Sequence, residues 1–145
     1  MAKSVLILNG PNLNMIGTRE PEIYGTETLA DVEQKCRKIA EHAGAELAFK
    51  QSNHEGEMVE IIQHAISEHD AIVINPAAYS HTSVAILDAL KMFKGTVIEI
   101  HISNIHQRED FRHFSFVSQR AEGVIVGCGM QGYELALQRA LGLIS

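Results

Sequence analysis

The alternation of apolar and polar positions along the chain predicts strands and helices in turn. Short runs of mostly apolar residues are typical of parallel strands that are covered on both faces of a sheet. We expect strands at residues 5–8, 46–50, 71–75, 97–101 and 123–126. The run at 46–50 is more polar than the other four, which indicates a strand at the edge of the sheet.

Between these strands, apolar residues recur at the spacing of one helix face. We expect helices over about residues 29–43, 58–66, 83–92 and 133–144. Thr26 or Thr28 is the expected N-cap of the first helix, and Gly44 is its expected C-cap. Ser83 caps the third helix in the same way. Residues 103–121 show no clean period, and we interpret them as a long functional loop with a short helical turn.

This order of elements predicts an α/β fold, a three-layer, doubly wound parallel sheet of five strands that is flavodoxin-like. The 145 residues are enough for one domain with its own core, so we expect a single domain over residues 1–145. The composition is that of a globular protein, with 46% hydrophobic and 21% charged residues.

Charge, apolar runs and cysteines narrow the functional class. The net charge of -6 argues against a nucleic-acid-binding surface, which is usually basic. No apolar run approaches the roughly 18 residues of a membrane-spanning helix, and the N-terminus lacks a signal-peptide pattern. Cys36 and Cys128 are too few for a disulfide scaffold and fit no zinc motif. We therefore expect a cytoplasmic protein without nucleic-acid or membrane partners.

Polar residues gather in the loops that follow the first four expected strands. Because parallel strands direct these loops to one edge of the sheet, we expect the side chains to converge there. The residues are Asn9, Asn12, Arg19 and Tyr24 in the first loop, Gln51, Ser52, Asn53 and Glu55 in the second, Asn75, Tyr79, Ser80 and His81 in the third, and His101, Ser103, Asn104, His106, Arg108 and Arg112 in the fourth.

In their order and spacing, these loop sequences resemble the type II 3-dehydroquinate dehydratase family over essentially the full chain. The matching pieces are residues 8–14, 17–21, 24–25, 51–53, 55–56, 75–76, 79–83, 99–106, 108 and 111–113. The resemblance implies a lyase that reversibly dehydrates 3-dehydroquinate to 3-dehydroshikimate in the shikimate pathway, through an enolate. It also implies a reaction that needs no metal ion, cofactor or Schiff base.

The resemblance assigns four catalytic residues. It implies that Tyr24 removes a proton from the carbon next to the ketone and that Arg19 supports the Tyr24 phenolate. Asn12 matches the residue that helps hold the enolate through an ordered water. His101 matches the acid that protonates the leaving hydroxyl. Glu99, two residues earlier on the same strand face, matches a partner of this histidine.

The role of Tyr24 makes a quantitative demand on its surroundings. The reference pKa of tyrosine is about 10, so half ionisation near neutral pH requires roughly 4 kcal/mol in favour of the phenolate. One cation about 4 Å away supplies an interaction of that order at an effective dielectric constant of about 20. Arg19 matches the residue in this role, and Arg108 is a second candidate.

Substrate contacts are also implied by the resemblance. The backbone N–H groups of Ile102 and Ser103, with the Ser103 hydroxyl, match the carboxylate site. Three further residues match contacts to substrate hydroxyls, namely Asn75, His81 and Arg112. Asp88 matches a residue that enters the site from a neighbouring subunit. The resemblance therefore implies a homo-oligomer, a dodecamer built from trimers, in which one subunit cannot complete the site.

Two glycines in the loop after the first expected strand allow its backbone to change conformation. Gly17 and Gly25 bracket the segment from Arg19 to Tyr24, and we expect this segment to close over substrate as a lid. Limited proteolysis tests this expectation, since substrate or product should suppress cleavage of a closing lid.

Ala77 stands where the family often has glycine, and its methyl group either tightens the pocket or shifts the backbone.

Two other functions are left open by the residues alone. Residues 127–132 fit the G-x-G-x-x-G spacing after a strand, which suggests a small nucleotide- or flavin-binding module. However, that fingerprint needs a later strand with an acidic residue, and only 13 residues of helical pattern follow Gly132. The eight histidines suggest a metal hydrolase, but His101 and His106 lack accompanying ligands at metal-site spacing.

Overall fold

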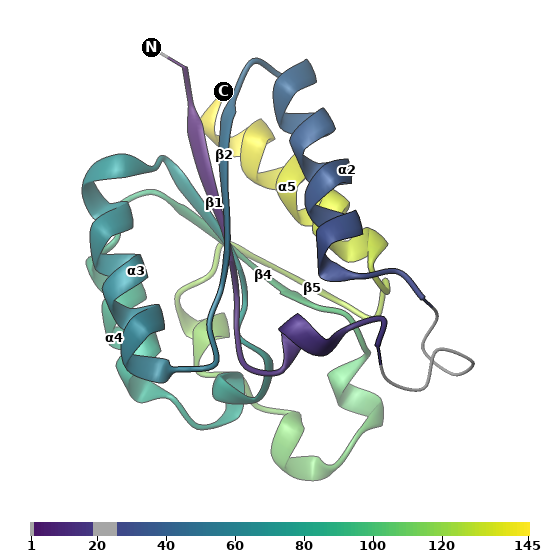
Figure 1. Cartoon of the computed structure of the whole chain (residues 1–145). Helices are drawn as coiled ribbons and strands as arrows, with labels where there is room; N and C mark the ends of the chain where they lie inside the picture. Colours follow the sequence, from purple (N-terminus) through teal and green to yellow (C-terminus); the bar gives the residue numbers. More distant parts are fainter. Residues whose placement is uncertain (1, 19–25) are drawn as a thin grey trace.

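Five parallel strands lie side by side in the order β2-β1-β3-β4-β5 in a computed structural model that describes residues 2–18 and 26–145 (Figure 1). The strands are β1 (Ser4–Asn9), β2 (Glu46–Gln51), β3 (Ala71–Asn75), β4 (Thr96–His101) and β5 (Gly123–Val126). The chain runs from β1 to β2 on one side and then crosses to β3 on the other side. A crevice forms outside the carboxyl ends of the strands at such a switch point. The predicted doubly wound α/β fold is confirmed.

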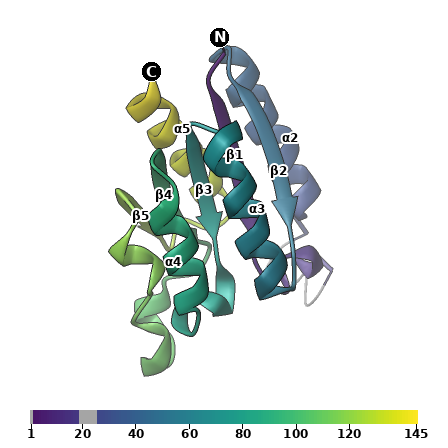
Figure 2. The ribbon, with the colours of Figure 1, turned by 90° about the vertical axis from the view of Figure 1, so that its left-hand side faces the viewer.

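Two helices cover each face of the sheet, as Figures 1 and 2 show. The helices are α2 (Leu29–His42), α3 (Glu55–Glu68), α4 (Val84–Met92) and α5 (Gln131–Ile144). Beneath α3 and α4, one buried cluster includes Met58, Ile62 and Leu90. Beneath α2 and α5, a second cluster includes Cys36 and Tyr133. The inner strands β1 and β3 are buried on both faces, because their side chains meet a helix layer on either side of the sheet.

The helix ends follow the expected capping chemistry. Thr28, rather than Thr26, caps α2, and its side chain and that of Asp31 each accept a hydrogen bond from the other residue's backbone N–H. Gly44 follows the helix with a φ of +71°, the left-handed conformation that ends many helices. The Ser83 hydroxyl accepts a hydrogen bond from the Ile86 N–H at the start of α4.

The structure differs from the sequence expectations in three places. β2 is an edge strand, as expected, but β5 is the other edge and is only partly covered, with Val124 46% exposed. Residues 103–121 hold three short 3-10 helices rather than one turn. α3 and α5 each begin earlier than the apolar stripe suggested, because their first turns are polar. Over the ranges that the structure describes, no helix has the length and apolar character needed to cross a membrane.

Candidate active site

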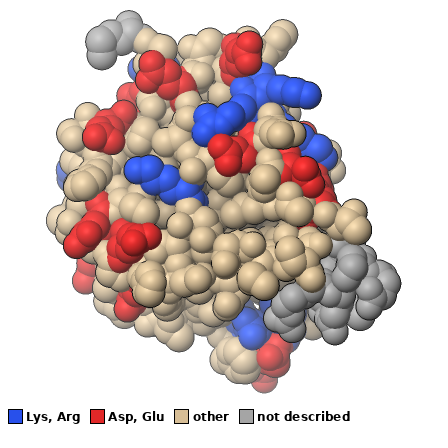
Figure 3. All heavy atoms as spheres, viewed as in Figure 1, with Lys and Arg blue, Asp and Glu red and all other residues tan. Residues whose placement is uncertain are grey.

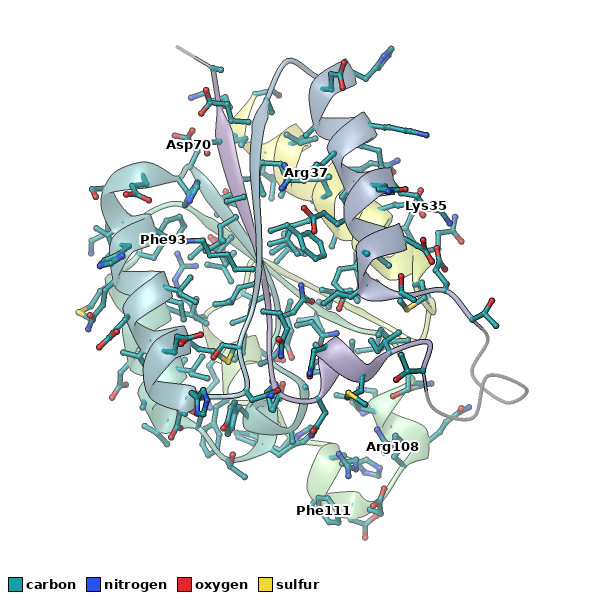
Figure 4. All side chains as sticks on the ribbon, viewed as in Figure 1. Lys35, Arg37, Asp70, Phe93, Arg108 and Phe111 are labelled. Carbon is teal, nitrogen blue, oxygen red and sulfur yellow. The ribbon has the colours of Figure 1, made fainter. Side chains whose placement is uncertain are left out.

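The register of the sheet places polar side chains in a row at its carboxyl edge. Asn9 of β1 is paired with Gln51 of β2 on one side and with Asn75 of β3 on the other. His101 ends β4 at the same edge. The loops after β1 and β4 extend beyond this edge, where Figure 4 shows Arg108 and Phe111. The predicted convergence of polar loop residues is therefore borne out for these strands.

Glu99 and His101 form a buried pair on one face of β4. Their side chains are 0% and 5% exposed, and His101 Nε2 donates a hydrogen bond to Glu99 Oε2. Two serine hydroxyls also donate to the carboxylate, Ser115 to Oε2 at 2.7 Å and Ser118 to Oε1 at 2.5 Å. Burial alone would raise the pKa of Glu99, but the hydrogen bonds from His101, Ser118 and Ser115 outweigh it and lower that pKa. Glu99 is therefore an anion at neutral pH.

This pairing fixes which nitrogen of His101 is available for chemistry. Because Nε2 is bonded to Glu99, Nδ1 is the nitrogen left to exchange a proton with another molecule. The ring of His81 stacks against that of His101, with centroids 6.4 Å apart. His81 Nδ1 donates to the Phe114 carbonyl at 2.7 Å, which leaves its Nε2 as an acceptor. His81 and His101 are thus brought together as predicted.

The Tyr133 hydroxyl holds the side-chain amides of Asn9 and Asn75 in place at the sheet edge, a role that the sequence reasoning missed. Its fully buried hydroxyl donates to Asn9 Oδ1 at 2.6 Å and accepts from Asn75 Nδ2 at 2.9 Å. Burial raises the pKa of Tyr133 well above its usual range, so the hydroxyl keeps its proton. Asn75 Oδ1 also accepts from the Ala77 N–H at 3.1 Å. The Asn75 amide is therefore held in one orientation at the carboxyl edge of the sheet.

Tyr133→Phe is expected to lower the free energy of unfolding by about 2 kcal/mol, because it leaves an amide oxygen and an amide N–H buried without partners. Urea unfolding at fixed protein concentration measures this change. Tyr79→Phe is the matched control, since the Tyr79 hydroxyl donates to the Asn53 carbonyl in an exposed position. Equal stability of the two variants would contradict the structural role of the Tyr133 hydroxyl.

Asn12 lies at the start of the loop after β1 with a φ of +70°. Its N–H donates to Asn53 Oδ1 at 2.9 Å, and Asn53 Oδ1 also accepts from Gln51 Nε2 at 3.1 Å. Asparagine tolerates this left-handed backbone better than most residues. The contacts tie the loop after β1 to the loop after β2 and fix the position of Asn12 at the edge.

The backbone of Ile102 and Ser103 is anchored by the glycine-rich loop after β5. The Gly129 N–H donates to the Ile102 carbonyl at 3.0 Å, and the Gly127 N–H donates to the Ser103 carbonyl at 3.2 Å. Within the described chain, neither the Ile102 nor the Ser103 N–H has a backbone acceptor. The binding of a substrate carboxylate by these two N–H groups stays a prediction. The G-x-G-x-x-G loop therefore holds the backbone of Ile102 and Ser103 in place. In residues 127–145, all of which the structure describes, no strand follows β5.

The remaining candidates have different surroundings. Arg112 Nε donates to Glu109 Oε1 at 3.1 Å, and Arg108 Nε lies 3.9 Å from the same oxygen. Asp88 is exposed on α4, and no hydrogen bond or ion pair within the described residues joins it to the edge. Arg19, Tyr24 and Gly25 lie outside the described residues. Gly17, at the near end of the expected lid, has a φ of +84°.

Ala77 adopts a φ of +52°, the left-handed region that favours glycine. The methyl group therefore stands on a strained backbone next to Asn75, rather than only occupying space in the pocket. Ala77→Gly is expected to raise the free energy of unfolding by about 1 kcal/mol through relief of this strain. Urea unfolding checks the prediction, and an unchanged or lower stability would show that Ala77 is accommodated without strain.

No three His, Cys, Asp or Glu side chains in residues 2–18 and 26–145 form a group arranged to hold a metal ion. The polar groups that the structure brings together are a hydrogen-bonded histidine, ordered amides and two backbone N–H groups without a backbone acceptor in residues 2–18 and 26–145. These groups suit proton transfer and the binding of a small oxygen-rich anion.

Comparisons with known proteins agree with this geometry. A relative from Streptomyces avermitilis, named 3-dehydroquinate dehydratase, is 63% identical over 140 residues, covering 96% of this chain and 88% of the relative. Agrobacterium fabrum 3-dehydroquinate dehydratase 2 is 63% identical over 139 residues, covering 96% and 95%. The crystal structure of type II dehydroquinase from Propionibacterium acnes superposes with a TM-score of 0.91 at 44% identity and 98% coverage of both chains. The profile of the family described as "Dehydroquinase class II" matches residues 3–141, and the chain belongs to this family.

Proposed function

We propose that the chain dehydrates 3-dehydroquinate to 3-dehydroshikimate at the carboxyl edge of its sheet, as a type II enzyme of the shikimate pathway. The observation that carries the proposal is the Glu99–His101 pair, in which a buried carboxylate holds one imidazole nitrogen while the other has no partner among the described residues. Family membership and relatives named 3-dehydroquinate dehydratase support the reaction. They favour it over the nucleotide- or flavin-binding alternative.

The proposed reaction proceeds in two proton transfers. Tyr24, as a phenolate stabilised by Arg19 and Arg108, takes a proton from the carbon next to the ketone. The resulting enolate is stabilised by Asn12 through a water molecule. His101 then gives the proton on its Nδ1 to the departing hydroxyl, the C–O bond breaks, and water leaves. The electron pair of the C–H bond becomes the new double bond of a conjugated enone.

Substrate recognition uses groups from two loops, those after β3 and β4. We assign the substrate carboxylate to the N–H groups of Ile102 and Ser103, because their carbonyls are anchored while these donors have no backbone acceptor among the described residues. Asn75, His81 and Arg112 are assigned to the substrate hydroxyls. The fixed amide of Asn75 and the oriented ring of His81 support this assignment, since pre-ordered donors bind at a smaller entropic cost.

We also propose that Asp88 acts in a neighbouring subunit of a homo-oligomer, a dodecamer of trimers. Asp88 lies on α4 four residues from two exposed apolar side chains, Val84 at 50% and Met92 at 49% exposure. Residues four apart lie on one face of a helix, so Asp88 is flanked by apolar surface suited to a protein contact. This placement supports an interface that would carry Asp88 into the next active site.

Mixed oligomers test the role of Asp88 across subunits. Asp88→Asn and Tyr24→Phe chains are each expected to be nearly inactive alone. When they are co-expressed in equal amounts, about a quarter of the sites regain both native residues if Asp88 comes from a neighbour. Steady-state activity of the mixed oligomer, compared with each variant alone, measures this recovery. No recovery in stable mixed oligomers would place Asp88 in its own subunit's site or outside it.

We further propose that residues 1–145 act as one catalytic domain in the cytoplasm, without nucleic-acid partners. The family profile spans residues 3–141, and strands from the whole chain share one sheet. Cys36 and Cys128 are both free thiols, as is usual in reducing compartments. On the face shown in Figure 3, basic side chains lie next to acidic ones rather than in a basic patch, which supports the absence of nucleic-acid binding.

A direct assay tests the proposed function. Protein purified with EDTA is mixed with 3-dehydroquinate, and ultraviolet absorbance is followed for the conjugated enone. The absorbance should rise with multiple turnovers, and added divalent metal should leave the rate unchanged. Activity that requires added metal would favour a metal hydrolase or lyase. A protein that is folded and oligomeric but shows no rise would overturn the proposed function.

A further inference from the structure

The carboxylate of Glu99 has more hydrogen-bond donors than a simple partner of His101 requires. Its Oε2 accepts from His101 Nε2 and from the Ser115 hydroxyl at 2.7 Å, and its Oε1 accepts from the Ser118 hydroxyl at 2.5 Å. Ser118 is the hydrogen-bond donor to Oε1 among the described side chains. Both serines belong to the segment after β4, which sequence periodicity did not explain.

Both serines contact the Glu99 carboxylate, which is the partner of the proposed acid His101, and neither belongs to the hydrophobic core. Ser115 is 7% exposed and Ser118 is an exposed residue of the short 3-10 helix Val117–Gln119. Each hydroxyl directs its hydrogen toward a carboxylate that is 0% exposed. A buried carboxylate keeps its negative charge only where such donors replace water.

We propose that Ser115 and Ser118 are positioning residues that keep Glu99 an oriented anion, so that Glu99 holds the His101 ring in the orientation needed for proton donation. This inference rests on the proposed role of His101 as the acid. Without the hydroxyls, the Glu99 carboxylate loses two of the donors that fix its position, and the imidazole that it holds loses its fixed orientation. A misoriented imidazole protonates the leaving hydroxyl more slowly.

Threonine and valine have the same shape, so a comparison of the two at position 118 isolates the effect of the hydroxyl. Ser118→Thr keeps the donor, and Ser118→Val replaces it with a methyl group that excludes water from the same place. Ser115→Ala provides an independent test of the second donor to the same carboxylate.

The expected result is a fall of about tenfold in kcat for Ser118→Val, with KM within about twofold of the parent, because the acid step alone is impaired. Ser118→Thr should recover most of kcat. Exchange of the substrate proton next to the ketone, followed in D2O by mass spectrometry, should continue at the parent rate in Ser118→Val. This readout separates the acid from the base, which a general structural defect would not do.

Two outcomes would overturn the inference. One is equal kcat for the Val and Thr variants, and the other is a parallel loss of proton exchange and dehydration in Ser118→Val. His101→Gln distinguishes a failure of the inference from a failure of the proposed function. If His101→Gln loses dehydration while the Val and Thr variants match, only the serines' role is wrong. If His101→Gln keeps full activity, the proposed acid itself is wrong.

Discussion

Tyr24→Phe is expected to lower kcat about 10⁴-fold, the largest effect of any single substitution in the proposed site, because phenylalanine has no oxygen to accept the substrate proton. Without this step no enolate forms, so the later loss of water has no intermediate from which to proceed. KM should change little, since the substrate carboxylate and hydroxyls are assigned to groups on other loops. Steady-state kinetics with 3-dehydroquinate measures both quantities.

Circular dichroism and size-exclusion chromatography provide the control for Tyr24→Phe. The variant should keep the secondary structure and oligomeric size of the parent. A folded variant that retains more than about a tenth of kcat would remove Tyr24 from the role of base, since general bases contribute at least about a hundredfold. Such a result would leave the reaction itself in place.

His101→Gln is expected to lower kcat about 10³-fold by removing the acid that protonates the leaving hydroxyl. Glutamine is the suitable replacement because its amide N–H can donate to Glu99 from near the position of the histidine Nε2, whereas it cannot deliver a proton. The fall in kcat would then report chemistry rather than an unpaired buried charge.

His101→Ala serves as the comparison for this second prediction. It abolishes the same chemistry but also leaves the buried Glu99 carboxylate without its histidine partner, so the free energy of unfolding should fall by about 3 kcal/mol. His101→Gln should be clearly more stable than His101→Ala, while both should be similarly inactive. Near-normal kcat in the stable His101→Gln variant would contradict the assignment of the acid.

The fold could be predicted because its determinants are local. Apolar runs at β1, β3 and β4 and helical stripes between them predict a buried parallel sheet, and Thr28 and Ser83 mark helix starts by capping chemistry. The sequence of β5 is as apolar as that of an inner strand and so predicts a strand covered on both faces, whereas β5 is only partly covered in the structure. Exposure of Val124 depends on what lies beside the strand, which an apolar run does not encode.

The parts of the site that escaped prediction depend on contacts between distant segments. Tyr133 lies on an apolar helix stripe and looks like a core residue, yet its hydroxyl joins Asn9 and Asn75 across more than 50 positions of sequence. Ser115 and Ser118 are single hydroxyls in a segment without period, and only the fold brings them to Glu99. For Tyr133 alone, the available signal was a polar atom on an otherwise apolar helix stripe, since a buried hydroxyl requires a partner.

Proton exchange at the carbon next to the ketone tests the division of labour between Tyr24 and His101 most directly. 3-Dehydroquinate is incubated in D2O with His101→Gln or Tyr24→Phe, and deuterium in the recovered substrate is measured by mass spectrometry. The account predicts that His101→Gln incorporates deuterium without forming the enone, because the base still acts, and that Tyr24→Phe incorporates none above the uncatalysed rate. Exchange by Tyr24→Phe, or its absence with His101→Gln, would contradict the assignment of base and acid.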